Sequence, residues 1–156
     1  MKSLAQRFSA GNDWKPCFVD ESIQDGIHDT MLTNHKIVAL VPITDGEKAK
    51  AFYVDKLGLE FRSDDGFAIV VIANGHMLRL TKMREVKPQP FTVLGWETAD
   101  IAADIRSLQV NGVTFERFGD FMKQDELGIW TAPDGTKVAW FKDPDGNILS
   151  LSQHSG

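Results

Sequence analysis

The stretch Lys142-Asp-Pro-Asp-Gly-Asn147, followed by Ile148-Leu-Ser-Leu-Ser152, predicts a tight turn that leads into a short strand. Its spacing recurs earlier in the chain. In residues 75–81 and in residues 146–152, a glycine is followed by leucines three and five residues later, with one polar residue between them. This repeat predicts a duplicated module, and it makes Arg79 and Ser150 equivalent positions.

The composition is that of an ordinary globular protein. The 156 residues, 42% hydrophobic and 25% charged, are enough for one sizeable core or two small packed modules. A net charge of −5 without a Lys/Arg run argues against a surface for nucleic acid or anionic membrane. Cys17 is the only cysteine, which excludes an internal disulfide and a cysteine-rich zinc site. No apolar run approaches the roughly 20 residues of a membrane span, and no secretory signal is recognisable, so we expect a cytoplasmic protein.

The first half of the pattern, residues 36–83, predicts a strand, a helix and three more strands. The apolar run 37–43 is typical of a strand, and Thr44 with Glu47 matches a capping box at the start of a helix that Gly58 ends. The three further strands are expected at residues 59–61, 67–73 and 76–81, the last two joined by an Asn74-Gly75 hairpin turn.

The same order recurs over residues 91–153, after a linker at 84–90 whose two prolines suit neither a helix nor a central strand. The expected elements are a strand at 92–97, a helix at 99–111, a segment at 113–115 that matches 59–61, a long loop at 118–127 leading to 128–131, and strands at 137–141 and 148–152. The sequence therefore predicts an α+β fold of two βαβββ modules.

Residues 1–33 form an N-terminal extension with little periodicity. It is either loosely ordered or an arm that packs on its own domain or on a partner. The apolar side chains of Trp14 and Phe18 favour the arm, because exposed residues of this kind are usually avoided.

At this point the chain resembles the vicinal oxygen chelate superfamily, which includes glyoxalase I, extradiol dioxygenases, and fosfomycin- and bleomycin-resistance proteins. The residues that carry the resemblance are Asp45, Ala49, Phe52-Tyr53 and Leu57-Gly58 in the first half, and Phe141 to Asn147 with Leu149 and Leu151 in the second. The resemblance covers residues 36–153. It implies that the paired βαβββ modules form a cup-shaped mixed sheet with the helices on its outer face.

Metal-using members of this family place His or Glu ligands on the first and fourth strands of each half. The matching positions here are Val38 and Val93 on the first strands, and Arg79 and Ser150 on the fourth. None of these is a good ligand for a divalent ion, since the valines have no lone pair, Arg is cationic and Ser is weak. We therefore expect no metal and no cofactor. The remaining candidate ligands are His35, His76, Glu97 and His154.

Strand alternation, together with the resemblance, indicates which side chains line the cup. The expected ligand-binding residues are Leu40, Met77, Arg79, Glu97, Trp130, Trp140 and Ser150. Trp140 either stacks on a ligand or is a core aromatic. Trp96, on the opposite parity, is expected to pack under the helix at 99–111, and the loop 118–127 is a candidate lid.

Arg79 and Glu97 are the two candidate catalytic residues. An inward Arg79 either clamps a carboxylate, phosphate or enolate, or pairs with Glu97 or another acid to close the pocket. Glu97 is either a general base in an apolar cup or a residue at the exposed end of its strand, and the second interpretation is favoured.

Three functions are compatible with these residues. The first is a metal-independent protein that binds a small apolar or aromatic molecule, including an anionic one. The second is a metal-independent lyase or isomerase that uses Arg79 and Glu97, and the third is a metal-dependent glyoxalase- or dioxygenase-like enzyme. The sequence leaves open whether the protein is an enzyme, and whether one chain or a pair of chains forms the cup. Family members are often dimers, so the resemblance implies a homodimer.

Overall fold

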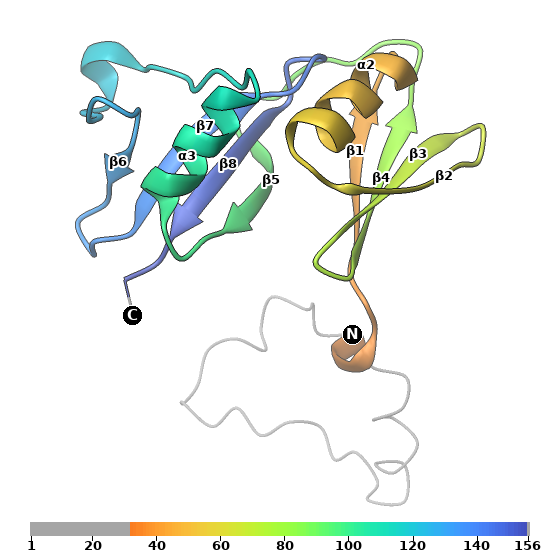
Figure 1. Ribbon diagram of the computed structural model, residues 1–156, viewed down its shortest axis with the longest axis horizontal. Coiled ribbons are helices and arrows are strands. Elements are labelled where there is room, and N and C mark those ends of the chain that lie inside the picture. The colour runs from red at the N-terminus through yellow and green to blue at the C-terminus, as the bar shows by residue number, and fades with distance from the viewer. Residues whose placement is uncertain (1–31, 156) are drawn as a thin grey trace, which may run out of the picture. The chain divides into compact units, whose positions relative to one another are not determined.

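The computed structural model describes residues 32–155 of the chain, which is drawn in Figure 1. The expected extension therefore lies almost wholly outside the described residues. The chain divides into two compact units, Met1–Lys36 and Ile37–Gly156. The described part of the first unit holds one short 3-10 helix, η3 (Leu32–Asn34). Among the described residues, no helix is long and apolar enough to cross a bilayer.

The first half of the second unit is a βαβββ module. Its elements are β1 (Val38–Ile43), α2 (Gly46–Lys50), the π-helix η4 (Ala51–Lys56), β2 (Glu60–Asp64), β3 (Ala68–Ala73) and β4 (His76–Lys82). The strands lie in the order β1-β4-β3-β2, with β1 parallel to β4 and the other neighbours antiparallel. Asn74 and Gly75 have φ angles of 46° and 79°, the left-handed pair that a two-residue hairpin turn requires. The predicted hairpin is therefore confirmed.

The start of the first helix differs from the expected capping box. The N-cap is Asp45, whose carboxylate accepts from the backbone N–H of Glu47 at 3.0 Å and of Lys48 at 3.1 Å. The prediction that Thr44 caps this helix is wrong, because the amide and hydroxyl of Thr44 both donate to Asp145 in the other half of the chain. A carboxylate at the N-cap satisfies free amide groups as well as a hydroxyl does, so the local pattern alone did not decide between the two residues.

The second half repeats the first. Its elements are β5 (Thr92–Glu97), α3 (Ile101–Val110), the short 3-10 helix η5 (Gly119–Phe121), β6 (Trp130–Thr131), β7 (Lys137–Lys142) and β8 (Ile148–Gln153). The strand order is β5-β8-β7-β6, with β5 parallel to β8. This arrangement corresponds, strand by strand, to the order β1-β4-β3-β2 of the first sheet. Asp100 caps α3 just as Asp45 caps α2, so the helices of the two modules begin in the same way.

Two expectations for the second half need correction. The helix expected at 99–111 is shorter, Ile101–Val110, because Asp100 is its N-cap. The segment 113–115 does not form a counterpart of β2; Phe115 makes only an isolated bridge to Phe141. The strand that occupies the β2 position is β6, and it reaches the sheet only after the loop that follows Phe115.

The turn between β7 and β8 joins the two modules. Asp143, 5% exposed, accepts hydrogen bonds from the Tyr53 hydroxyl and from the Asn147 side-chain amide, both at 2.8 Å. The same Asn147 amide donates to the carbonyl of Pro42 at 2.8 Å, and Asp145 accepts from Thr44. The turn that predicted the fold therefore also attaches the second module to the helix and the first strand of the first module.

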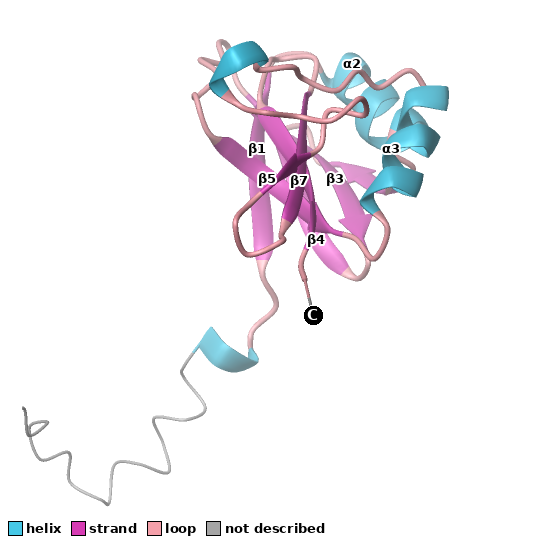
Figure 2. Cartoon of the chain, turned by 90° about the vertical axis from the view of Figure 1, so that its left-hand side faces the viewer, coloured by secondary structure: helices cyan, strands magenta, loops and turns pink. Residues whose placement is uncertain are grey.

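Within the described residues, one hydrophobic core runs through both modules. Phe52 on η4 lies 6.4 Å from Phe141 on β7, measured between ring centroids, and Phe141 stacks on Trp96 of β5 at 6.2 Å. Phe52 and Tyr53 are both buried and belong to this core. In the view of Figure 2, α2 and α3 both lie on the same side of the strands. The polar contact of Lys56 Nζ with the Gly112 carbonyl, 3.2 Å, links the ends of the two helical segments.

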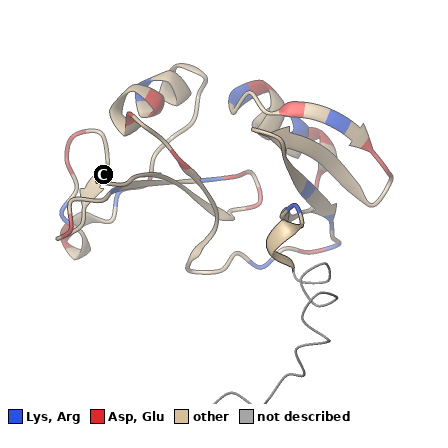
Figure 3. Cartoon of the chain, turned by 90° about the horizontal axis from the view of Figure 1, so that it is seen from below, with Lys and Arg blue, Asp and Glu red and all other residues tan. Residues whose placement is uncertain are grey.

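These observations confirm the α+β class and the two βαβββ modules. The strands form two four-stranded mixed sheets, one in each module. In the view of Figure 3, acidic and basic residues lie interspersed over the described part of the chain.

Candidate functional site

Each sheet has one face against the core and one face away from it, which we call the open face. In β1 the alternation is clear, because Val41 and Ile43 are fully buried whereas Val38 and Leu40 are 42% and 64% exposed. The register sets Leu40 beside Arg79, so that Arg79 of β4 lies on the open face too. The open face of the first sheet therefore carries exposed apolar side chains around one cation.

Arg79 has a partner on this face. Its guanidinium donates to the carboxylate of Asp65 at 2.6 Å, and the two side chains are 32% and 37% exposed. This hydrogen bond holds the pKa of Asp65 below its usual range. Of the two alternatives for Arg79, the structure contains the ion pair, and the acid is Asp65 rather than Glu97. Because the pair is a third exposed, a ligand anion can reach the guanidinium.

Thr81 lies two residues beyond Arg79 on the same face. Its Oγ1 atom is buried and has no hydrogen-bond partner among the described residues. A buried hydroxyl without a partner costs about 1–3 kcal/mol. The open face of the first sheet thus contains one polar group that the described residues leave unsatisfied.

The open face of the second sheet is aromatic. Trp130 lies opposite Val138 and Trp140 lies opposite Ser150 in the ladders, so both indoles are on the same face. Their ring centroids are 6.3 Å apart with a tilt of 41°. Trp140 donates its Nε1–H to Thr92 Oγ1 at 3.1 Å, which satisfies its polar atom and fixes the ring.

Phe118 completes this aromatic cluster. Its ring meets that of Trp140 edge-on at 5.5 Å. The loop that holds it is braced by Gln124, whose side-chain amide accepts from the Phe118 amide at 2.8 Å and donates to the Gly128 carbonyl at 2.7 Å. In the sequence, Phe118 was marked only by its place in a candidate lid. We call Phe118, Trp130 and Trp140 the aromatic platform.

Ser150 lies at the centre of the second sheet and is buried, 8% exposed. Its register partner is Gly95, and a Cβ atom at Gly95 would come within 2.7 Å of Ser150 Oγ. The absence of a side chain at Gly95 therefore leaves the room that the Ser150 hydroxyl occupies.

Glu97 is exposed at the end of β5. Its carboxylate has no hydrogen bond or ion pair within residues 32–155, and Arg79 is bonded to Asp65 instead. The structure therefore brings Trp130, Trp140 and Ser150 together on one sheet and Leu40, Met77 and Arg79 on the other. It does not join Glu97 to Arg79.

The positions that hold metal ligands in metal-using relatives do not fit a metal here. The register places Leu40 beside Arg79 and Gly95 beside Ser150, so neither these pairs nor Val38 and Val93 supply imidazole or carboxylate donors. Within the described residues there is also no group of three or more His, Cys, Asp or Glu side chains that could hold an ion.

The chain is similar to known proteins in both sequence and fold. Residues 38–73 match a family model described as bleomycin resistance protein-like N-terminal. The solved structure of TnmS3, an antibiotic binding protein from Streptomyces sp. CB03234, is 30% identical, with a TM-score of 0.59, covering 80% of this chain and 99% of that one. A search of curated proteins gave no significant match.

Two further solved structures share the fold. A member of the glyoxalase/bleomycin resistance protein/dioxygenase superfamily from Sphaerobacter thermophilus is 27% identical, with a TM-score of 0.63, covering 80% of this chain and 100% of that one. A lactoylglutathione lyase from Agrobacterium tumefaciens is 17% identical, with a TM-score of 0.56, covering 77% of this chain and 93% of that one. The second of these is similar in fold alone.

Proposed function

Because the chain belongs to the vicinal oxygen chelate superfamily, the group of the glyoxalase, bleomycin-resistance and dioxygenase proteins, we propose that it binds a small aromatic molecule without a metal. The relative from Streptomyces is an antibiotic binding protein, which supports binding rather than turnover. The observation that carries the proposal is the aromatic platform on the open face of the second sheet.

The platform suits a flat ring. Trp140 is only partly buried and its Nε1–H is already bonded to Thr92, so its ring can stack on a ligand without leaving a polar atom unpaired. The partly buried indole of Trp130 and the edge of Phe118 lie beside it. Ser150, opposite Trp140 in the ladder, adds a hydroxyl to the same face.

Arg79 supports an anionic group on the ligand. Its guanidinium is bound to Asp65 by one short hydrogen bond, and an Arg side chain carries five donors, so donors remain for a carboxylate or phosphate. Thr81 Oγ1, which lacks a partner among the described residues, lies on the same face. A ligand anion would bind to the exposed part of the Arg79 guanidinium, beside Asp65.

Arg79 and the platform lie on different sheets, so the site needs both open faces. Val38, Leu40 and Met77 are exposed on adjacent strands of the first sheet, 42%, 64% and 37% respectively. Exposed apolar surface of this kind is typical of an interface. We propose that a second copy of the chain covers it and completes the cup, which makes the protein a homodimer. The homodimer and the cytoplasmic location stay predictions.

The binding test uses naphthoate and its neutral analogue naphthylmethanol, titrated by calorimetry. We expect naphthoate to bind, and Trp140→Ala to weaken both compounds about tenfold. Arg79→Gln should weaken naphthoate alone, whereas Asp65→Asn should strengthen it by releasing the guanidinium. Trp96→Phe is the control for naphthoate, because Trp96 lies on the core face. Equal binding by wild type and Trp140→Ala would contradict the proposal.

The dimer is tested separately by sedimentation. Leu40→Glu places a charge on the exposed apolar face and should shift the protein to monomers, while Phe67→Glu, at another exposed apolar position, should not. A wild-type protein that sediments as a monomer at all concentrations would exclude the shared cup. The lyase or isomerase alternative is not proposed, because no contact within residues 32–155 brings Arg79 and Glu97 to one substrate.

A further inference from the structure

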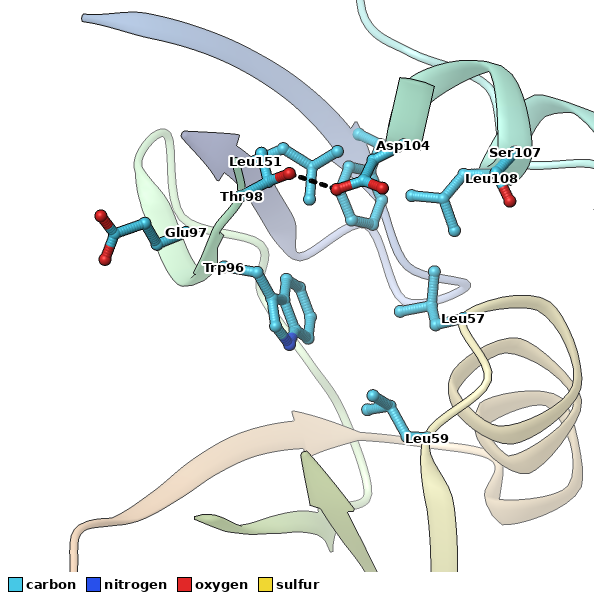
Figure 4. Close-up of a pocket in the computed structure, with 10 residues that line it drawn as sticks. Leu57, Leu59, Trp96, Glu97, Thr98, Asp104, Ser107, Leu108 and Leu151 are labelled. Carbon is cyan, nitrogen blue, oxygen red and sulfur yellow. Dashed lines mark hydrogen bonds between the residues drawn. The ribbon is translucent and has the colours of Figure 1, made fainter. Parts of the chain in front are cut away.

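A cleft lies between the two modules, on the side of the sheets away from the proposed cup. It has a volume of about 340 Å³. Its apolar walls are Leu57 and Leu59 from the first module and Trp96 and Leu108 from the second, as Figure 4 shows. Its size falls within the range of small-molecule pockets. We call it the intermodule cleft.

The cleft continues into a wider cavity of about 930 Å³, and the two share Leu59, Trp96 and Thr98 among their lining residues. Trp96 is the central aromatic of this region. One of its faces stacks on Phe141, at 6.2 Å between centroids and 20° between planes, so the core holds the ring in place. A rigid, half-buried indole beside an open volume is a favourable surface for an apolar or cationic group.

The polar groups of the cleft come from one side of α3 and from the end of β5. Ser107 and Leu108 follow Asp104 by three and four residues, a spacing that puts them on the same side of the helix as Asp104. Asp104 accepts a short hydrogen bond from the Thr98 hydroxyl, drawn in Figure 4. A carboxylate has acceptor sites for about four hydrogen bonds, so capacity remains on Asp104.

The charge of the cleft is negative. Asp104 lines it, and Glu97 lies at its outer rim with its carboxylate directed away from Trp96 in Figure 4. Among the described residues that line the cleft or the wider cavity, there is no Lys or Arg. A cation is therefore favoured over an anion at this position.

We propose that the intermodule cleft is a second binding site, for a small organic cation with an apolar or aromatic body. The ammonium group donates to the free acceptor sites of Asp104, and the apolar body lies between Trp96 and the leucines of the first module. The intermodule cleft itself is separate from the aromatic platform and from Arg79, because none of these residues lines it, whereas the wider cavity also reaches Met77 and Gly95.

The test uses phenethylammonium, with phenethyl alcohol and phenylpropionate as neutral and anionic analogues, added to ¹⁵N-labelled full-length protein. We expect phenethylammonium to shift the indole signal of Trp96, and to bind about fivefold more tightly than the alcohol, the effect of about one exposed charge pair. Phenylpropionate should not shift that signal. Shifts confined to Trp130 and Trp140, or equal binding of all three compounds, would overturn the proposal.

Three variants separate the site from a nonspecific effect. Asp104→Asn should remove the preference for the cation and leave the alcohol unchanged, whereas Asp120→Asn, an exposed acid outside the cleft, should change neither. Ser107→Phe, at an exposed helix position, should fill the cleft and abolish binding of both compounds. Trp140→Ala should leave phenethylammonium binding unchanged while it weakens naphthoate binding. Retained binding in Ser107→Phe would overturn the proposal.

Discussion

The hydroxyl of Tyr53 on η4 donates to Asp143 Oδ2 at 2.8 Å, across 90 residues of sequence. Tyr53 is fully buried and Asp143 is 5% exposed. Burial raises the pKa of Asp143, and the hydrogen bonds from Asn147 and Tyr53 oppose this effect. The donors around Asp143 therefore determine whether a carboxylate can be accommodated between the two modules.

Removal of the Tyr53 hydroxyl should weaken the junction. Tyr53→Phe keeps the ring in the core but deletes one of the donors to a buried carboxylate, so we expect the free energy of unfolding to fall by about 2 kcal/mol. The measurement is denaturant unfolding of Tyr53→Phe, Asp143→Asn and the double variant. A coupling energy of zero in this double-mutant cycle would show that the bond does not contribute to stability.

Because Tyr53 is buried, we also expect the protein to lose stability at alkaline pH. Burial, followed by the negative charge of Asp143, raises the pKa of Tyr53 above its ordinary value of 10.0. As the pH rises above about 10, the unfolded chain releases this proton while the folded chain keeps it, so the free energy of unfolding falls with pH. The stability that Tyr53 contributes is fully present below pH 10, and the Tyr53→Phe variant should not show this loss of stability at high pH.

The chain makes that measurement simple, because Tyr53 is its only tyrosine. The near-ultraviolet absorbance of tyrosinate should stay low above pH 10 until the protein unfolds, and should then rise together with the loss of secondary structure. Tyrosinate that forms at pH 10 in a protein with native circular dichroism would contradict the buried hydrogen bond.

Replacement of Thr81 by Val should stabilise the protein. Its buried Oγ1 has no partner among the described residues, and Thr81→Val replaces the hydroxyl by a methyl group of similar shape. We expect the free energy of unfolding to rise by about 1 kcal/mol in the unliganded protein. Thr114→Val, at an exposed position, is the matched control and should change stability by less than about 0.5 kcal/mol. A loss of stability in Thr81→Val would mean that the hydroxyl has a partner in solution.

Gly95 and Ser150 should be coupled. A methyl group at Gly95 would lie 2.7 Å from Ser150 Oγ, so Gly95→Ala should cost about 1 kcal/mol of stability unless the hydroxyl moves. In a Ser150→Ala background the nearest side-chain atom is the Cβ of residue 150, at 4.0 Å, and the same substitution should cost much less. Equal costs in the two backgrounds would show that the contact does not limit residue 95.

Local signals in the sequence predicted most of the fold. The Asn74-Gly75 turn fixes a hairpin because both residues adopt left-handed angles, and the alternation in β1 separates a buried face from an open one. The capping prediction at Thr44 failed because the hydroxyl has a distant competitor, Asp145, which no local pattern contains. The match of 113–115 to 59–61 failed for a related reason, since β6 takes the edge of the sheet instead.

The candidate site was predicted only in part. Sequence alternation placed Leu40, Arg79 and Trp140 on the open faces of their strands, and the ladder registers agree. It did not identify Asp65 as the partner of Arg79 or Phe118 as the neighbour of Trp140, because a turn and a loop bring these residues in. The intermodule cleft had no sequence signal, since its walls come from five separate segments.

The sequence by itself determined the duplication, the family and the chemical types of side chain on each strand, because these depend on spacing and on the two-residue repeat of a strand. Only the tertiary structure decided that Asp143 lies under Tyr53, that Arg79 is bound to Asp65, and that the modules enclose a cleft behind their sheets. The physical reason is that side chains pack and form hydrogen bonds when they are close in space. Residues that are far apart along the chain can be close in space, and the sequence alone does not show which of them are.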